Sequence, residues 1–178
     1  VKVRAIAFDK AGNYSDGSFV YTYTVDLQGP EAVTGLVAVP STTGVLLNWN
    51  DVQDKDFMYF KVERKDSDGG QFIEIGNVYN ALGMNVSGLK SNSKYWFRVV
   101  AYDKLGNRGT PSDEIEVVTK RDTTAPVIAS ISPSPARFAN QIPLRVTVKD
   151  NVGVESVTLM MSTDLATWTE IAVLNPGA

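Results

Sequence analysis

Carboxylates are the side chains of this sequence that could most readily do chemistry. Asp51, Asp54 and Asp56 follow one another closely, and a pair of carboxylates across a cleft can hydrolyse glycosides. The chain has no histidine and no cysteine, which removes the commonest general base, the serine–histidine triads and most zinc sites. No insertion near the three aspartates would form a cleft. We therefore expect them to be solvated turn formers, and the chain not to be an enzyme.

Calcium binding is a second chemistry to consider. Asp9–Asn13 and Asp103–Asn107 share the pattern Asp-Lys-x-Gly-Asn, which offers carboxylate and amide oxygens. Each segment brings one carboxylate, whereas calcium takes roughly six to eight oxygen ligands. Aspartate, glycine and asparagine also suit tight turns, so the pattern favours hairpin turns. Asp122 with Asp150 and Asn151 is a better calcium candidate, because a linker and a loop could converge there.

A third group of residues could bind a ligand without catalysis. Tyr59, Trp96, Arg98 and Tyr102 fall on outward positions of two alternating segments. Exposed aromatic side chains beside an arginine are typical of faces that bind carbohydrate or protein. Cross-strand pairs among the same side chains would instead stabilise a sheet by a few tenths to about 1 kcal/mol each. The sequence is therefore compatible with two interpretations: a ligand-binding face, or a row of cross-strand pairs that only stabilises the sheet.

The composition of this 178-residue chain argues against some classes of partner. Its net charge of −3 comes from 17 basic and 20 acidic residues, mixed along the sequence without a basic block, so we expect no nucleic-acid partner. The sequence contains no run of about 18 apolar residues, so it predicts no membrane-spanning helix. The absence of cysteine is compatible with a reducing cytosol and with a secreted protein whose cores need no disulfides.

Short β-branched and aromatic segments, separated by turn clusters, predict an all-β protein without helices. An internal repeat divides it: Val3–Asn13 reappears as Phe97–Asn107, 94 positions later, and Gly29-Pro30 reappears as Ala125-Pro126, 96 positions later. A period of about 95 residues suits one β-sandwich module. We therefore predict three parts: the last two strands (F and G) of one module in residues 1–28, a complete module in 29–121, and the beginning of another in 122–178.

The middle part carries the pattern of a known family. Trp49 closes an alternating strand, and Leu89 lies six residues before Tyr95, which opens another. This arrangement resembles a fibronectin type III domain over residues 30–121. The resemblance implies tandem immunoglobulin-like β-sandwiches, with Trp49 plugging the space between two sheets and the Tyr95 hydroxyl reaching back to nearby backbone. The part after Asp122–Pro126 lacks the leucine–tyrosine corner and resembles the broader class of bacterial immunoglobulin-like modules.

Alternation with period two assigns the faces of the strands in the middle part. The residues predicted to point inward are Val45, Leu47, Trp49, Phe60, Val62, Val86, Tyr95, Phe97, Val99, Ala101, Ile115 and Val117. Those predicted to point outward are Leu46, Asn48, Tyr59, Lys61, Glu63, Trp96, Arg98, Val100, Glu114 and Glu116.

These observations give two hypotheses of function. The first is a non-catalytic spacer whose partners are neighbouring modules of a larger secreted or surface-displayed bacterial protein. The alternative is an adhesion module that binds carbohydrate or protein through its aromatic face, including one accessory to a catalytic domain elsewhere in the parent chain. No cofactor is expected under either hypothesis, calcium excepted.

The two ends have complementary deficits. Residues 1–26 supply only an F–G hairpin, which is marginally stable alone. Residues 127–178 supply the first strands of a sandwich, whose apolar positions would lie bare without an F–G pair: Val146, Val148, Val157 and Leu159. Either both ends belong to whole modules of a larger polypeptide, or the tail of one copy accepts the head of the next by strand complementation.

Overall fold

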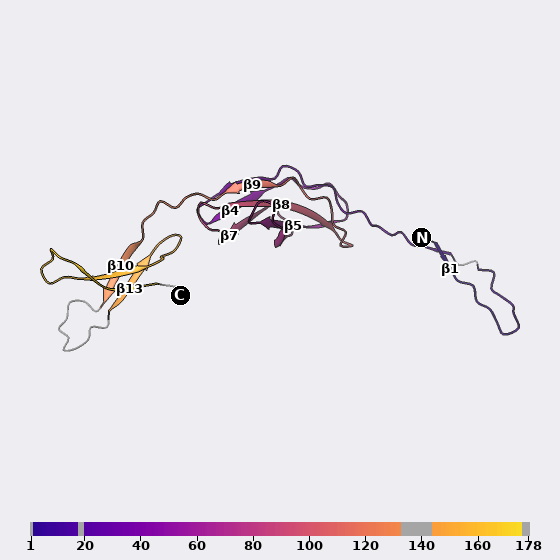
Figure 1. Ribbon diagram of the computed structural model, residues 1–178. Coiled ribbons are helices and arrows are strands. Elements are labelled where there is room, and N and C mark those ends of the chain that lie inside the picture. Colours follow the sequence, from indigo (N-terminus) through magenta and orange to yellow (C-terminus); the bar gives the residue numbers. More distant parts are fainter. Residues whose placement is uncertain (1, 18–19, 133–143, 176–178) are drawn as a thin grey trace. The chain divides into compact units, whose positions relative to one another are not determined.

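The computed structural model describes residues 2–17, 20–132 and 144–175 (Figure 1). In these ranges the regular structure is entirely β-strand, which confirms the all-β prediction. We describe the chain as a head (residues 2–28), a middle module (29–121) and a tail (122–175). Within the described ranges there is no helix that is long and apolar enough to cross a membrane.

Two sheets make up the middle module, and Figure 1 labels most of their strands. The three-stranded sheet has the order β3-β4-β7, with β3 at Val37–Pro40, β4 at Gly44–Asn48 and β7 at Gly83–Ser87. The four-stranded sheet has the order β6-β5-β8-β9, with β6 at Ile73–Val78, β5 at Phe57–Lys65, β8 at Lys94–Asp103 and β9 at Ile115–Val118. The residues predicted to point inward lie within these strands or directly beside them.

The core of this module lies between the inward faces of these strands. Every residue predicted to point inward is buried, apart from Ile115, which is half-buried. Trp49 is 4% exposed, and its ring meets that of Phe60 edge-to-face at 5.5 Å between centroids. Since Trp49 follows β4 and Phe60 belongs to β5, this contact joins the two sheets. The contact agrees with the predicted role of Trp49 as the inter-sheet plug, which stays a prediction.

The predicted tyrosine corner is also present. The Tyr95 hydroxyl accepts a hydrogen bond from the backbone N–H of Lys90 at 3.0 Å, and Leu89 is buried. This bond satisfies a backbone donor in the connection between β7 and β8. The corner thus fixes where β8, the longest strand, begins.

The segment that enters the middle module is held against the turn after β8. Pro30 is fully buried, and a Cβ atom added to Gly29 would overlap the backbone of Arg108. A Cβ atom on Gly109 would overlap the carbonyl oxygen of Pro30. The side-chain amide of Asn107 donates to the backbone carbonyl of Asp26 at 3.2 Å. Only glycine fits at these two crossing points.

The head is a hairpin of β1 (Lys2–Arg4) and β2 (Val20–Thr22). Its turn at Asp9–Asn13 repeats the hydrogen bonds of the turn at Asp103–Asn107: in both, the aspartate carboxylate accepts from two backbone N–H groups and from the asparagine side chain. In both segments the Asp-Lys-x-Gly-Asn pattern therefore forms a turn that the aspartate and asparagine side chains close by hydrogen bonds.

Two more hairpins form the tail. β10 (Val127–Ser132) pairs with β11 (Arg145–Lys149), and β12 (Val157–Met161) pairs with β13 (Thr169–Leu174). All four strands lie in residues 127–178, for which the sequence predicts the first strands of a further sandwich. Apolar residues recur at every second position of β11, which gives this strand one apolar face, whereas in β12 Met160 adds an apolar residue to the second face.

Candidate functional site

The four residues of the predicted binding face lie on one face of the four-stranded sheet. The antiparallel register of β5 and β8 places Tyr59 opposite Tyr102, Glu63 opposite Arg98 and Lys65 opposite Trp96. Opposed residues of an antiparallel pair have Cβ atoms about 4.5–5.5 Å apart, so their side chains can contact one another. The sequence therefore places these residues on one surface correctly.

Trp96 is not exposed, which corrects the expectation from sequence. Only 8% of its surface is accessible. The ammonium group of Lys65 lies 5.4 Å from the Trp96 ring centroid and 2.9 Å from a carboxylate oxygen of Glu114. A lysine lies along apolar surface with its methylene chain and keeps its charge at the edge, and this arrangement covers the indole. Trp96 therefore has little surface left for a ligand.

Arg98 is also engaged within the sheet. Its Nε donates to Glu63 Oε2 at 2.6 Å, and its guanidinium carbon lies 4.0 Å from the centroid of the Phe72 ring. Arg108 donates to the other oxygen of Glu63 at 3.2 Å. Glu63 is buried, so the two arginines compensate a carboxylate that would otherwise be costly to remove from water. The arginine of the predicted binding face is thus part of an ion-pair network.

The tyrosines form a stacked row. The rings of Tyr59 and Tyr102 are nearly parallel, at 7°, with centroids 5.1 Å apart, and Tyr79 lies 5.3 Å from Tyr59 on the other side. The Lys61 ammonium lies 4.9 Å from the Tyr102 centroid. The faces of Tyr59 and Tyr102 are therefore largely taken up by each other. Tyr79, which the sequence interpretation missed, is 54% exposed and follows β6 at the edge of the sheet.

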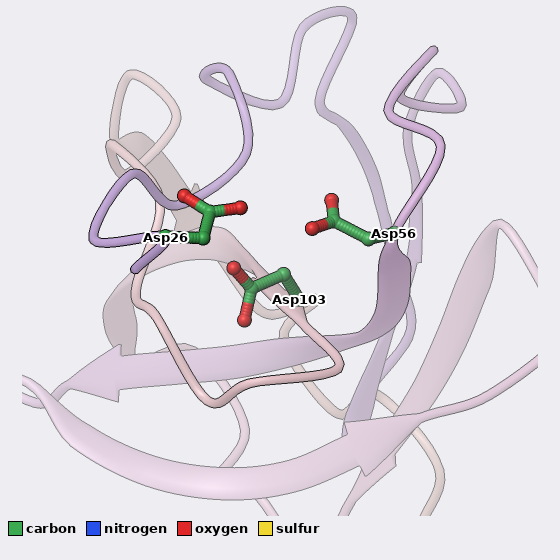
Figure 2. Close-up of side chains that lie close together, drawn as sticks. All are labelled: Asp26, Asp56 and Asp103. Atoms are coloured by element: carbon green, nitrogen blue, oxygen red, sulfur yellow. The ribbon is translucent and has the colours of Figure 1, made fainter. Parts of the chain in front are cut away.

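A second cluster consists of three carboxylates, and Figure 2 shows them pointing toward one another. One carboxylate oxygen from each of Asp26, Asp56 and Asp103 lies within 4.8 Å of the other two. Asp26 precedes the middle module, Asp56 precedes β5, and Asp103 ends β8. Such oxygens suit a hard cation such as calcium. However, both oxygens of the buried Asp103 already accept hydrogen bonds from Leu105 and Asn107 of its own turn.

The pKa values of Asp56 and Asp103 are shifted in opposite directions. A hydrogen bond with Asp54 raises the pKa of Asp56 to about 6, with burial and the negative charges of Asp54, Asp103 and Asp26 adding to the effect. Burial acts to raise the pKa of Asp103 as well, but the hydrogen bonds from Asn107 and Leu105 outweigh it, and the net shift is downward. Asp56 is therefore the group that holds a proton at mildly acidic pH.

This difference predicts a pH dependence of stability. Because the folded-state pKa of Asp56, about 6, lies above its ordinary value of 3.8, the folded chain binds this proton more tightly than the unfolded chain does. The stabilisation is complete below the ordinary value and is lost as pH rises through the folded value. We expect the melting temperature to contain a component that falls between about pH 4 and 6, and Asp56→Asn to remove it. Scanning calorimetry across this range measures both, and parallel profiles for the two chains would contradict the assignment.

In the tail, the structure brings together part of the predicted calcium site. The Asn151 side-chain amide donates to Asp122 Oδ1 at 3.1 Å, which joins the linker to the loop after β11. Asp150 Oδ1 accepts from the N–H groups of Val152 and Gly153, and its Oδ2 is buried without a hydrogen-bond partner among the described residues. Calcium binding by Asp122, Asp150 and Asn151 stays a prediction.

Known proteins resemble this chain in sequence and in fold. The family model of the fibronectin type III domain matches residues 29–118. Chitinase A1 of Niallia circulans is 29% identical over 76% of this chain, which spans only 20% of the length of that protein. A fibronectin type III domain of human fibronectin type III domain containing protein 3 is 23% identical, with a TM-score of 0.48 over 57% of this chain and 95% of that domain. The FN5 domain of Drosophila Lar is 23% identical, with a TM-score of 0.44 over 52% of this chain and 99% of that domain.

Proposed function

Because this chain belongs to the fibronectin type III domain family, we propose that it is a set of non-catalytic spacer modules in a larger secreted or surface-displayed bacterial protein. The modules are an F–G end in residues 1–28, a complete type III module in 29–121 and a further immunoglobulin-like module that begins at 122. The similarity to the bacterial chitinase supports this proposal, because it covers most of this chain but a fifth of that protein. Such modules separate and orient other domains.

The main support for the spacer proposal is that the side chains of the aromatic face contact other side chains of the same sheet. Tyr59 stacks on Tyr102, Lys65 lies over Trp96, and Arg98 pairs with Glu63. Each of these contacts is a cross-strand pair that stabilises the sheet. A ligand would have to displace them, whereas a spacer needs them in place.

The second candidate function is adhesion, and one observation favours it. Tyr79 is more than half exposed at the open end of the tyrosine row, where a sugar ring could stack on it. The similarity to a chitinase makes chitin the polysaccharide to test. In this proposal Tyr79 and the edges of Tyr59 and Tyr102 take the role that the sequence assigned to Trp96 and Arg98.

Sedimentation with insoluble chitin and with cellulose distinguishes the two functions. The spacer proposal predicts that the 178-residue chain stays in the supernatant with both polysaccharides at micromolar concentration. Tyr79→Ala is the matched variant, because an edge tyrosine of this exposure contributes little to folding. Retention of the parent chain that Tyr79→Ala abolishes, with an unchanged melting temperature, would establish adhesion and overturn the spacer proposal. Retention that survives Tyr79→Ala would also overturn it and would place the binding surface elsewhere.

A further inference from the structure

The middle module holds the chain by hydrogen bonds as far as Lys120. The N–H of Lys120 donates to the carbonyl of Ser41 at 2.8 Å, and its carbonyl accepts from the N–H of Asn92 at 3.3 Å. Just before it, the buried Thr119 donates its hydroxyl to the carbonyl of Lys90 at 2.6 Å. These partners lie in two loops of the same module, between β3 and β4 and between β7 and β8. The end of the middle module is therefore fixed up to this residue.

Asp122 is the first residue that the tail holds. Its Oδ1 accepts from the side-chain amide of Asn151, in the loop between β11 and β12, at 3.1 Å, and from the backbone N–H of Thr124 at 3.0 Å. The hydrogen bond from Thr124 and then that from Asn151 lower the pKa of Asp122, so that at neutral pH the group is a carboxylate and a strong acceptor. Arg121 is the one residue between Lys120 and Asp122.

The same linker aspartate occurs 96 positions earlier, at the entrance of the middle module. Asp26 corresponds to Asp122, and in both residues Oδ1 accepts at 3.0 Å from the backbone N–H two positions later. The loop aspartates correspond at the same offset. Asp54 and Asp150 each accept through Oδ1 from the backbone N–H two positions later, at 3.2 and 2.8 Å. The joint before the tail therefore repeats the local structure of the joint before the middle module.

The side chain that holds the linker differs between the two joints. Asn151 corresponds to Lys55 at the offset of 96. At the first joint the amide comes instead from Asn107, in the turn after β8, which donates to the backbone carbonyl of Asp26 at 3.2 Å. Both joints thus use an asparagine side chain to hold the linker aspartate, but from different loops. A contact that is built twice from different elements indicates that holding the linker is a property of the joint.

We propose that the hydrogen bond from Asn151 to Asp122 is a lock that joins the linker to the tail, and that Arg121 is the hinge between the middle module and the tail. With the lock closed, Arg121 alone lies between the two anchoring points, with its two soft dihedral angles. With the lock open, the span extends to Pro126, whose ring fixes its own φ. The inference rests on the proposed spacer function for its purpose, because a one-residue hinge limits how far a spacer bends.

Trypsin tests the lock, because it cleaves after lysine and arginine, and Lys120 and Arg121 are both exposed. A protease binds several residues in extended form, so cleavage at this joint follows the population in which the lock is open. Asn151→Ala is expected to raise the cleavage rate at residues 120–122 about three- to tenfold, which is the change in equilibrium for the loss of one hydrogen bond in contact with water. Mass spectrometry of the fragments identifies the cleaved bonds and measures the rate.

Lys55→Ala is the matched control, because it truncates the equivalent position in the loop of the middle module. It is expected to leave the cleavage rate unchanged. Asn151→Asp is expected to raise the rate at least as much as Asn151→Ala, since a second carboxylate then replaces the donor. Adding Asp122→Asn to Asn151→Asp is expected to bring the rate back toward that of the parent, because the pair again has one donor and one acceptor.

Nitrogen-15 relaxation measures the lock in the intact chain without a protease. The amides of Thr123 and Thr124 are expected to have order parameters near 0.8 in the parent and below about 0.6 in Asn151→Ala, at an unchanged melting temperature. Equal cleavage rates in the parent and Asn151→Ala, an equal rise in Lys55→Ala, no rescue by Asp122→Asn, or equal order parameters would each overturn the lock. Binding to chitin is a separate result, because it would overturn the spacer function without changing any of these four measurements.

Discussion

Replacing Trp49 with alanine is expected to lower the free energy of unfolding of the middle module by about 3–5 kcal/mol. The side chain is almost completely buried, and its edge-to-face contact with Phe60 joins the two sheets. Alanine would leave a cavity that the sheets cannot close without moving their paired strands. Urea unfolding followed by circular dichroism in the β-sheet region measures the difference without relying on tryptophan fluorescence.

Trp49→Phe is the matched control. The Trp49 indole nitrogen is buried without a hydrogen-bond partner among the described residues, so phenylalanine removes an unsatisfied donor while it keeps an aromatic ring against Phe60. We expect this variant to lose only about 1–2 kcal/mol. A Trp49→Ala chain that melts within two or so degrees of the parent would show that Trp49 does not plug the space between the sheets.

Trp96→Ala is expected to cost about 2–4 kcal/mol, although Trp96 lies on the outer face of its sheet. The reason is that Lys65 and its partner Glu114 cover the indole, so its removal uncovers apolar surface and leaves the lysine without its contact. Chemical unfolding of the same chain measures this loss.

Leu46→Ala provides the comparison for an outward residue that is truly exposed. Leu46 lies on β4 and is 45% accessible, so its truncation is expected to change the free energy of unfolding by less than about 0.5 kcal/mol. If Trp96→Ala behaved like Leu46→Ala, the exposed aromatic face predicted from sequence would be restored, and with it the case for a binding surface.

The difference between Trp49 and Trp96 shows what alternation can predict. Period two gives the face to which a side chain points, and it is correct for both residues. It does not give the cover that residues of other strands provide, and for Trp96 that cover comes from β5 and from Glu114, which precedes β9. Glu63 and Val100 are buried on the same outer face, also against expectation from an outward position.

Sites formed by residues close together in the sequence could be predicted better than sites formed by distant segments. The turn at Asp103–Asn107 is predictable because its hydrogen bonds join residues at most four positions apart. The contact of Asp103 with Asp26 and Asp56 is not predictable, because the three aspartates come from segments that only the folded chain brings together. Tyr79 was missed for a related reason: it lies one residue beyond the end of β6, where alternation gives no assignment.

The glycine crossing at the entrance of the middle module has a mechanical consequence. Gly29 and Pro30 lie directly against Arg108 and Gly109, and Asn107 holds the carbonyl of Asp26. Under tension applied through the head, the load would reach the end of β8 through these contacts before it stretched the connection to β3. A larger side chain at Gly29 would break these contacts. The module would then begin to unfold from its first strand, β3, at a lower force.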